Sequence, residues 1–367
     1  MAEAIPLKNY FGLELAKKLG KKVKEVYPEF NFNSYIKYIK KDIEPLELNA
    51  RCELIADGLR KYLPSSYSNA IDILISILGP PLESHEGMFI HGSMWYPLGM
   101  FVKKYGQDDL ETSLKAVYEI TQRNTAEFAV RPLIEKYPDE VLKIFRKWAN
   151  DKSFHVRRLT SEGLRPRLPW AGRLTVFKDE PERVIEILEL LRKDESDFVR
   201  KSVANHLNDI LKDNRAAGMK VLKRWSKEKH PATNKIIKHA MRNLIKEGNP
   251  EAMKMMGYDN KTKINVSKLA LPRKVKNGEK MEFSFALSCD KPANVMVDYV
   301  MHFARKGGKS NAKVFKIGEK RIGKEISELR KSHSFKKVTT RVYYPGRHRL
   351  EIQVNGAVLA GKDFDLI

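Results

Sequence analysis

The spacing of hydrophobic residues along the chain divides it into two parts. Up to about residue 257, hydrophobic side chains recur mostly every three or four positions, which predicts amphipathic helices. Beyond that point the period falls to two, which predicts half-buried strands. This alternation is found over residues 281–287, 295–303 and 350–354. The chain is therefore expected to begin with a helical part and to end with a part built of strands.

The helical part contains an internal repeat. The segment 148–168 aligns without a gap on the segment 191–211 at an offset of 43 residues, and a third copy begins 34 residues further on, at Trp225. Helix pairs at such periods are typical of an α-solenoid of the HEAT type. We therefore predict a HEAT-like α-solenoid over residues 1–257, followed by an immunoglobulin-like β-sandwich over residues 258–367.

The net charge of the chain indicates the kind of partner that it binds. The 367 residues include 69 Lys and Arg against 46 Asp and Glu, a net charge of +23, which predicts a polyanionic partner. Residues 259–367 alone hold 24 Lys and Arg against 11 Asp and Glu. We therefore expect both parts of the chain to face the same polyanion. For any single lysine, a solvated surface position is the alternative.

Three carboxylates have unusual positions in the repeat. Glu162 and Asp209 are 47 residues apart, which is the repeat offset plus about one helical turn, so they should share a helix face on adjacent repeats. Glu127, 35 residues before Glu162, lies among apolar and small residues. Acids on the binding face of a basic protein disfavour the binding of phosphates, so their presence there requires a role other than phosphate binding. Pairing with neighbouring arginines or helix capping is the alternative.

A cationic base in DNA would provide that role. An N-alkylated base carries positive charge that weakens its glycosidic bond, and its departure leaves a sugar resembling an oxocarbenium ion. Carboxylates near the sugar stabilise this charge and position or deprotonate the attacking water. The three acids are therefore candidate catalytic residues of a base-excising enzyme.

Aromatic residues supply a second element. Trp170 follows Pro169, where the helix should end, and could leave its indole at the mouth of the groove between repeats. A Trp face attracts a cationic base and stacks on any base. Trp95 is a weaker candidate of the same kind. The alternative for both is packing in the core.

Basic residues near the starts of the second helices and around Trp170 are candidate phosphate ligands. They are Arg157, Arg158, Arg165, Arg167, Arg173, Arg200 and Lys201. In the predicted sandwich, the corresponding candidates bracket a Gly-Gly turn and are Arg305, Lys306 and Lys309. Arg157 and Arg200 could equally pair with Asp151 and Asp194 to close the turns between helices.

Three segments carry a resemblance to a known family. They are residues 125–132, 155–170 and 202–210. These segments resemble those of the bacterial DNA alkylation-repair glycosylases built from HEAT-like repeats, and the resemblance is closest to the AlkC branch. Some members of that branch also carry a C-terminal immunoglobulin-like domain, which agrees with the predicted sandwich.

The resemblance implies a monofunctional glycosylase that excises 3-methyladenine and 3-methylcytosine from double-stranded DNA and leaves an abasic site. It places the catalytic carboxylates on Glu127, Glu162 and Asp209 and the active-site Trp on Trp170. It also implies a duplex that is kinked around the lesion rather than a deep pocket for a flipped base. The sandwich would clamp the DNA.

The expected cellular setting is the bacterial cytoplasm. Cys52 and Cys289 lie in different predicted domains, which favours a reducing compartment. Neither a signal peptide nor a membrane-spanning stretch is recognisable in the sequence. We expect a monomer that associates with the nucleoid and not with a membrane, and the sequence indicates no metal site and no cofactor.

Two other functions fit the same sequence. A non-catalytic HEAT-repeat protein could bind damaged or branched DNA on this scaffold, and it would not need all three acids. A scaffold for a protein or RNA partner would have scattered acids and a packed Trp170. Base release from methylated duplex DNA would distinguish the enzyme from both.

Overall fold

The computed structural model describes residues 6–88, 92–258, 262–305, 310–338 and 341–367. Contacts within the chain divide it into two compact units, Met1–Ala240 and Met241–Ile367. In the described residues, no helix combines the length and the apolar character needed to cross a membrane.

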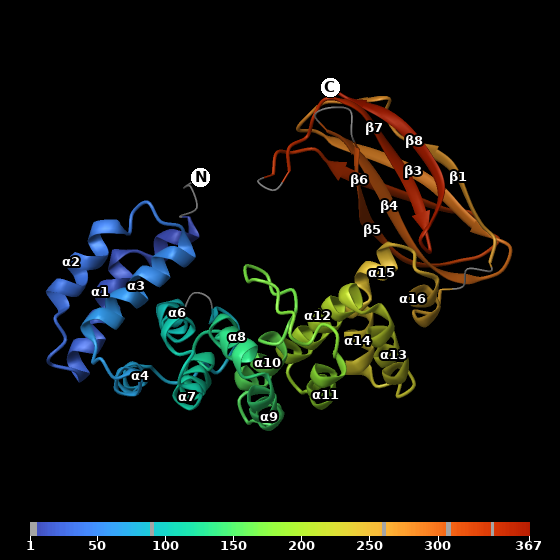
Figure 1. The fold of residues 1–367 in the computed structure, drawn as a ribbon. Coiled ribbons are helices and arrows are strands. Elements are labelled where there is room, and N and C mark those ends of the chain that lie inside the picture. Colours follow the sequence, from blue (N-terminus) through green and yellow to red (C-terminus); the bar gives the residue numbers. More distant parts are fainter. Residues whose placement is uncertain (1–5, 89–91, 259–261, 306–309, 339–340) are drawn as a thin grey trace. The chain divides into compact units, whose positions relative to one another are not determined.

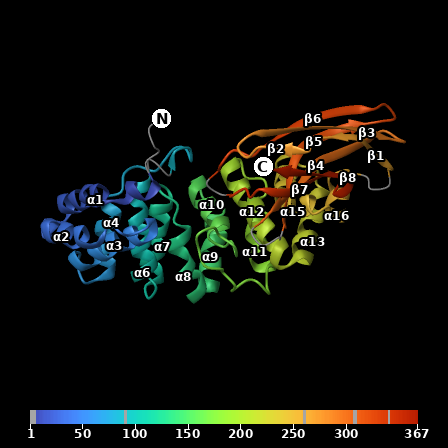
Figure 2. The same ribbon diagram turned by 90° about the horizontal axis from the view of Figure 1, so that it is seen from above.

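The first unit is an array of helices in two layers (Figures 1 and 2). One layer consists of α3 (Leu48–Tyr62), α6 (Tyr96–Tyr105), α8 (Glu127–Lys136), α10 (Phe154–Glu162), α12 (Asp197–Asp213) and α14 (Pro231–Ala240). The other consists of α4 (Tyr67–Ser76), α7 (Leu110–Thr121), α9 (Pro138–Trp148), α11 (Glu182–Leu191) and α13 (Arg215–Ser226). The array is preceded by η1 (Leu7–Phe11), α1 (Leu13–Val26) and α2 (Phe32–Asp42), and η2 (Ser93–Trp95) leads into α6.

The predicted repeat is confirmed by where the helices begin. Helices α10, α12 and α14 start at Phe154, Asp197 and Pro231, which are offset by 43 and then 34 residues. Helix α12 contacts both α10 and α14, and Leu159 and Leu207 are fully buried. Each helix of this layer therefore buries its apolar stripe on its neighbours, as stacked repeats require.

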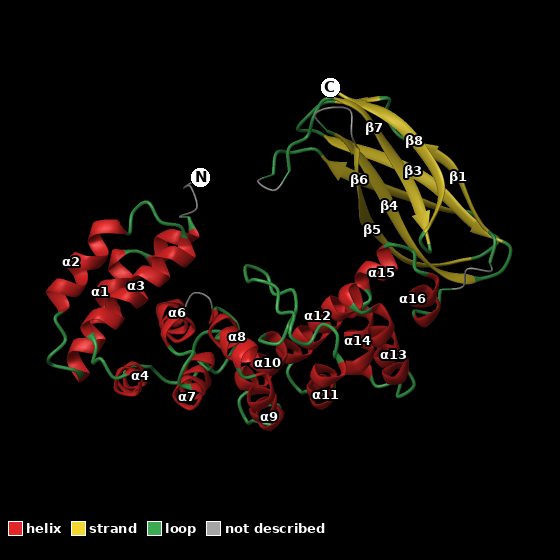
Figure 3. Cartoon of the chain, viewed as in Figure 1, coloured by secondary structure: helices red, strands yellow, loops and turns green. Residues whose placement is uncertain are grey.

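The second unit contains a β-sandwich, drawn in yellow in Figure 3. Its three-stranded sheet has the order β1-β3-β6, and its five-stranded sheet has the order β2-β8-β7-β4-β5. The strands are β1 (Ile264–Ala270), β2 (Lys274–Val275), β3 (Lys280–Cys289), β4 (Ala293–Ala304), β5 (Ser310–Ile322), β6 (Ser327–Ser334), β7 (Gly346–Val354) and β8 (Ala357–Leu366). All pairs are antiparallel except β2 with β8.

The core of the sandwich is formed by the alternating apolar positions. Met281, Phe283, Phe285 and Leu287 of β3 are buried, and they pack with buried residues of β4 and β7. The fold class expected from the sequence, a helical solenoid followed by an immunoglobulin-like sandwich, is therefore confirmed.

Two short helices, α15 (Arg242–Lys246) and α16 (Pro250–Met255), belong to the second unit. Gln353 Nε2 of β7 donates a hydrogen bond of 3.0 Å to the carbonyl of Lys246. Gly248 and Gly356 both have positive φ, and a Cβ added to Gly356 would lie 2.0 Å from the Gly248 Cα. These helices therefore pack on the sandwich, whereas the boundary of the functional domains at residue 257 stays a prediction.

Candidate active site

The three acids singled out in the sequence lie on neighbouring helices of the first unit. Glu127 is the first residue of α8, Glu162 is the last residue of α10, and Asp209 lies in α12. All three side chains are buried. A Cβ at Gly163 would lie 2.8 Å from Val130 Cγ1, so glycine at this position lets the end of α10 approach α8 closely.

Two arginines connect these acids. Arg158 Nη1 lies 3.1 Å from Glu127 Oε2, and its Nη2 lies 3.5 Å from Glu162 Oε1. Arg165 Nη1 donates to Glu162 Oε1 at 2.7 Å, and its Nε donates to Asp209 Oδ2 at 2.9 Å. The five side chains, which we call the acid–arginine chain, alternate in charge across α8, α10 and α12. Most of the negative charge of the acids is therefore balanced within the protein.

Glu162 has the most hydrogen-bond donors of the three acids. Besides Arg165, Ser202 Oγ donates to Glu162 Oε2 at 2.6 Å, and Ser202 also lies 3.0 Å from Ser161 Oγ. Both serines are buried, so the hydrogen bond to Glu162 is shielded from water. Glu162 is therefore fixed in orientation by donors on both carboxylate oxygens.

The pKa values of the acids differ because their surroundings differ. Burial raises the pKa of Glu127 above its ordinary value, and Arg158 offsets this only in part. Burial likewise raises the pKa of Asp209, against the effect of Arg165. Burial also acts to raise the pKa of Glu162, but Arg158, Arg165 and the Ser202 hydrogen bond outweigh it and bring the pKa below its ordinary value. Glu162 is therefore the acid held most firmly in its charged form.

A pocket of about 200 Å³ lies next to this cluster in the first unit. Glu127 and Glu162 contribute to its lining, together with Asn124 and Thr125. Its remaining wall is apolar and aromatic and is made by Leu48, Met88, Tyr96, Phe128, Leu168, Pro169 and Trp170. Two acids therefore face a small pocket with mainly apolar walls.

Trp170 lies at this pocket with its ring largely in solvent. It is 76% exposed, although Trp is usually among the more buried residues. Its φ of 64° is in the left-handed region, which is unusual for a large side chain and stores strain. Trp95, in contrast, is 6% exposed and packs in the core, which is the alternative interpretation of that residue. We therefore leave Trp95 out of the proposed site.

Two of the predicted phosphate ligands bind carboxylates at the helix turns. Arg157 is buried and donates from Nε and Nη2 to Asp194 at 2.6 and 3.0 Å, and from Nη1 to the Asp151 carbonyl at 2.9 Å. Arg200 pairs with Asp197 and also donates to the Asp194 carbonyl. Both side chains therefore close turns between helices, and we do not include them in the proposed DNA surface.

The other predicted basic residues have different surroundings. Arg158 and Arg165 donate to the three acids, and Arg167 donates to both oxygens of Asp213 at 2.9 and 2.5 Å. Exposed side chains are found at Arg173, Lys201 and Arg305. Lys306 and Lys309 lie outside the described residues. A phosphate-binding role for the exposed residues stays a prediction.

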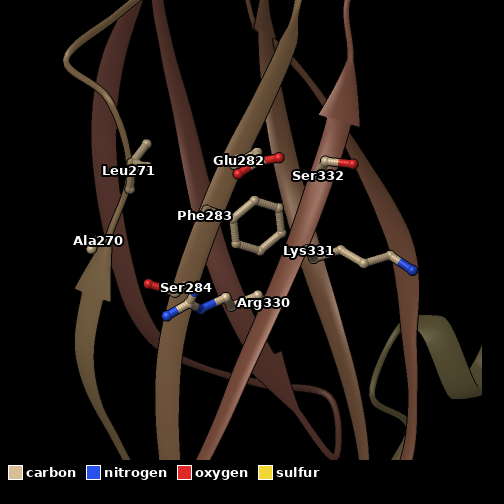
Figure 4. A pocket seen from close by; sticks show the side chains of 8 residues that line it. All are labelled: Ala270, Leu271, Glu282, Phe283, Ser284, Arg330, Lys331 and Ser332. Carbon is tan, nitrogen blue, oxygen red and sulfur yellow. The ribbon is translucent and has the colours of Figure 1, made fainter.

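A larger hollow of about 680 Å³ lies on the three-stranded sheet of the sandwich (Figure 4). Glu282 and Ser284 of β3 line it together with Arg330 and Ser332 of β6. None of the predicted site residues lines it. Within the described part of the chain, no group of His, Cys, Asp and Glu side chains could hold a metal ion. The acid–arginine chain therefore remains the candidate active site.

Sequence reasoning missed Ser202 and assigned Arg158 and Arg165 to DNA phosphates. A signal for Ser202 was present, because it lies seven positions, or two helical turns, before Asp209 and so on the same face of α12. No comparable pattern in the sequence indicated that the guanidinium groups of Arg158 and Arg165 point at the acids.

Comparison with known proteins identifies the class. Residues 83–253 match the family described as "DNA alkylation repair enzyme", and residues 265–367 match the family described as "Uncharacterised protein YhaZ, C-terminal Ig-like domain". The fold is thus that of a DNA alkylation repair enzyme that carries a C-terminal immunoglobulin-like domain.

Two relatives are similar over nearly their whole length. The chain is 37% identical over 363 residues to the uncharacterized protein YhaZ of Bacillus subtilis (strain 168), covering 98% of this chain and 99% of YhaZ. The structure of the alkylpurine DNA glycosylase AlkC of Pseudomonas fluorescens, bound to DNA containing an abasic-site analogue, superposes with a TM-score of 0.91. That match has 33% identity and covers 99% of this chain and 100% of AlkC. The chain belongs to the family of DNA alkylation repair enzymes that includes AlkC and YhaZ.

Proposed function

We propose that the protein is a monofunctional DNA glycosylase that hydrolyses the glycosidic bond of cationic alkylated bases in duplex DNA. Its substrates would be 3-methyladenine and 3-methylcytosine. The observation that carries this proposal is the pair of acids, Glu127 and Glu162, at a pocket whose rim holds an exposed Trp170. The similarity to AlkC, a glycosylase bound to DNA in its structure, supports the same reaction class.

A cationic alkylated base can leave without first being protonated by the enzyme. The bond between the sugar C1′ and the base nitrogen breaks, and its electron pair neutralises the positive charge of the base. Glu162, held in its charged form, stabilises the cation that develops on the sugar. Glu127, whose pKa is raised, accepts the proton of the water that attacks C1′.

Asp209 has a different position from the other two acids. Its carboxylate binds Arg165, whereas the pocket is lined by Glu127 and Glu162. We therefore assign Asp209 the role of orienting Arg165, which in turn binds Glu162. This role differs from the one that the resemblance implies, in which Asp209 is itself a catalytic carboxylate.

The charge of the cluster suits a cationic substrate. With every group ionised, the three acids and two arginines carry one net negative charge, and Lys212 offsets it only at Asp209, 3.7 Å away, which does not line the pocket. A base with one positive charge complements this, and Trp170 offers its face for stacking or cation–π contact. Because the arginines balance most of the acid charge, phosphates can still approach this part of the protein.

The basic sandwich would contribute phosphate contacts to the same DNA. In this proposal the protein acts as a monomer on chromosomal DNA in the bacterial cytoplasm. The alternative, a non-catalytic reader of damaged or branched DNA, requires no base release.

The deciding experiment is chromatographic detection of 3-methyladenine released from methylated duplex DNA by the purified protein. Release should fall at least about a hundredfold in Glu162→Gln, which is the scale of a lost charge stabiliser. Glu140→Gln is the matched control, because it makes the same chemical change at an exposed position of α9. A wild-type protein that binds the DNA but releases no base would overturn the proposal.

A further inference from the structure

Arg131 lies in α8, one helical turn after Glu127, and its guanidinium is directed at backbone rather than at an acid. Arg131 Nη1 donates to the carbonyl of Arg165 at 2.8 Å and lies 3.4 Å from that of Gly163. Arg131 Nη2 donates to the carbonyl of Gly172 at 2.6 Å. One side chain therefore binds both ends of residues 163–172, which we call the Trp170 loop.

This arrangement is costly for the fold. Arg131 is 6% exposed, and within the described residues it has no ion pair with a carboxylate. A buried guanidinium without a bound counter-ion loses its hydration and recovers only part of it from neutral acceptors. Hydrogen bonds to the loop carbonyls therefore only partly offset the cost of burying Arg131. We explain this arrangement by the functional side chains that the Trp170 loop carries.

The Trp170 loop holds two functional side chains that point in opposite directions. Arg165 points inward, where it binds Glu162 and Asp209. Trp170 points outward into solvent from a left-handed backbone conformation. A strained residue keeps its conformation only where its surroundings fix it. The hydrogen bonds from Arg131 to the carbonyls of Arg165 and Gly172 constrain the backbone on both sides of Trp170 in this way.

We propose that Arg131 is a positioning residue that sets the Trp170 loop relative to α8. It fixes the backbone carbonyl of Arg165, and through Gly172 it fixes the segment that presents Trp170. Its guanidinium points at carbonyl groups and does not line the pocket, so it acts through the loop and not on the substrate. The catalytic consequence of this role rests on the glycosylase function proposed above.

The variants that test this role differ in the donors that they keep. Arg131→Met retains the length and apolar stem of the side chain but removes every donor. Arg131→Lys retains the charge and one donor group, but not the fork that reaches two ends of the loop. Single-turnover excision of 3-methyladenine should fall roughly tenfold to a hundredfold in Arg131→Met, the scale of a misplaced active-site group. Arg131→Lys should recover part of the loss.

A double-mutant cycle shows whether the loss passes through Trp170. In a Trp170→Ala background, Arg131→Met should lower excision by a smaller factor than it does in the wild-type background, because one of the two groups that it positions is already gone and only the effect through Arg165 remains. Affinity for undamaged duplex should change little, since Arg131 is buried. Equal factors in the two backgrounds would overturn the proposal.

A spectroscopic measurement tests positioning without relying on activity. The chain has four tryptophans, Trp95, Trp148, Trp170 and Trp225, so 5-fluorotryptophan labelling gives four ¹⁹F resonances. The resonance of Trp170 is assigned by Trp170→Phe. In Arg131→Lys, the Trp170 resonance should shift or broaden, while those of Trp148 and Trp225 stay in place. An unchanged Trp170 resonance in folded Arg131→Lys overturns the proposal.

The two proposals can fail separately. If the wild-type protein releases no base, the glycosylase function fails, and the fluorine spectrum still decides whether Arg131 positions the loop. If the wild-type protein is active and both the spectrum and the excision rate of Arg131→Met are unchanged, only the positioning role fails. Should Arg131→Met not fold, Arg131→Lys carries both measurements.

Discussion

Ser202 Oγ donates a hydrogen bond of 2.6 Å to Oε2 of Glu162, from the helix that also carries Asp209. The donor reaches the carboxylate oxygen opposite the one that Arg165 binds. Because Ser202 is buried, this hydrogen bond faces little competition from water. It lowers the pKa of Glu162 and fixes the plane of its carboxylate.

Replacing Ser202 by Ala should steepen the acidic limb of the pH profile of base excision. In the parent this limb reports Glu127, the proposed base, because the pKa of Glu127 is raised whereas that of Glu162 is lowered. Without the Ser202 donor the pKa of Glu162 rises. A hydrogen bond to a charged group is worth about 1.5–3 kcal/mol, or about one to two pH units, so both acids are then protonated in the same pH range. Ser202→Thr retains the hydroxyl and is the control, and an acidic limb of unchanged slope in Ser202→Ala would contradict the prediction.

The three acids should differ in the size of their effect. Glu162→Gln removes the charge nearest the proposed sugar cation and should lower excision at least about a hundredfold. Asp209→Asn acts through Arg165 and should cost less, on the order of tenfold. Single-turnover rates on duplex containing 3-methyladenine measure both effects. Equal losses in the two variants would return Asp209 to a direct catalytic role.

Substrate charge should decide which lesions are excised. The acid–arginine chain and the face of Trp170 favour a cationic base, whereas an uncharged base such as uracil or ethenoadenine gains only stacking on Trp170. Such a base also leaves less readily, because no positive charge weakens its bond. Parallel assays on duplexes that differ only in the lesion measure this, and efficient release of uracil would contradict the mechanism.

Asp298 of β4 gives the sandwich a pH-dependent stability. It is buried, and burial raises its pKa to about 6, although Lys316 and Lys246 act in the opposite direction. The folded state therefore binds the proton more tightly than the unfolded state, so stability is greatest below the unfolded pKa and is lost as the pH rises through about 6.

Asp298→Asn should remove that loss. The variant should be more stable than the parent at pH 8 by about 3 kcal/mol, because the pKa rises from 3.8 to about 6 and each unit is worth about 1.4 kcal/mol. At pH 4 the two should differ little, because Asp298 of the folded parent is then largely protonated. Calorimetric unfolding at the two pH values measures this difference in stability. Tryptophan fluorescence would not, because all four tryptophans lie before residue 241 and report on the other unit. Asp290→Asn, at an exposed position of the same sandwich, is the control. Equal stabilisation at both pH values would assign the effect to packing.

Periodicity and repeat arithmetic were sufficient for much of the fold and for the acids. The period of three to four residues in one part and of two in the other predicted helices and strands, and the offset of 43 residues placed Glu162 and Asp209 on adjacent helices. Both signals are local or repeated, so they can be read without knowledge of distant contacts.

The path of the Trp170 loop could not be predicted in this way. Arg165 and Asp209 are 44 residues apart, and their contact depends on a loop with no periodicity and with a left-handed residue at Trp170. A sequence pattern favours phosphate binding for any arginine near a helix start. The sequence left pairing with arginines open as an alternative for the acids and pairing with an aspartate open for Arg157. It did not indicate that Arg158 and Arg165 are the arginines that bind the three acids, so these two were assigned to DNA.

The burial of Asp298 was similarly hidden. It lies opposite Gln353 in the register of β4 and β7, on a face where alternation predicts solvent. The amide of Gln353 binds the carbonyl of Lys246 in α15, so a helix before the sandwich meets this face. Contacts of this kind join residues more than 100 positions apart and leave no trace in a short window of sequence.

Removal of the second unit should weaken DNA binding in a salt-dependent way. Because α15 and α16 pack on the sandwich, a deletion of residues 241–367 avoids leaving their apolar faces uncovered. Residues 259–367 alone hold 24 Lys and Arg against 11 Asp and Glu, so phosphate contacts should be lost with them. Each lost contact flattens the dependence of log affinity on log salt by about 0.9.

Binding of a fluorescent duplex at several salt concentrations measures this slope. The deleted protein should have a slope smaller by several contacts, whereas Arg173→Gln in the full chain should reduce it by about one at most. Because the acid–arginine chain lies wholly in the first unit, excision at saturating protein should be reduced but not abolished. A slope that does not change on deletion would mean that the sandwich makes no phosphate contact, and its lysines would then serve solubility or another partner.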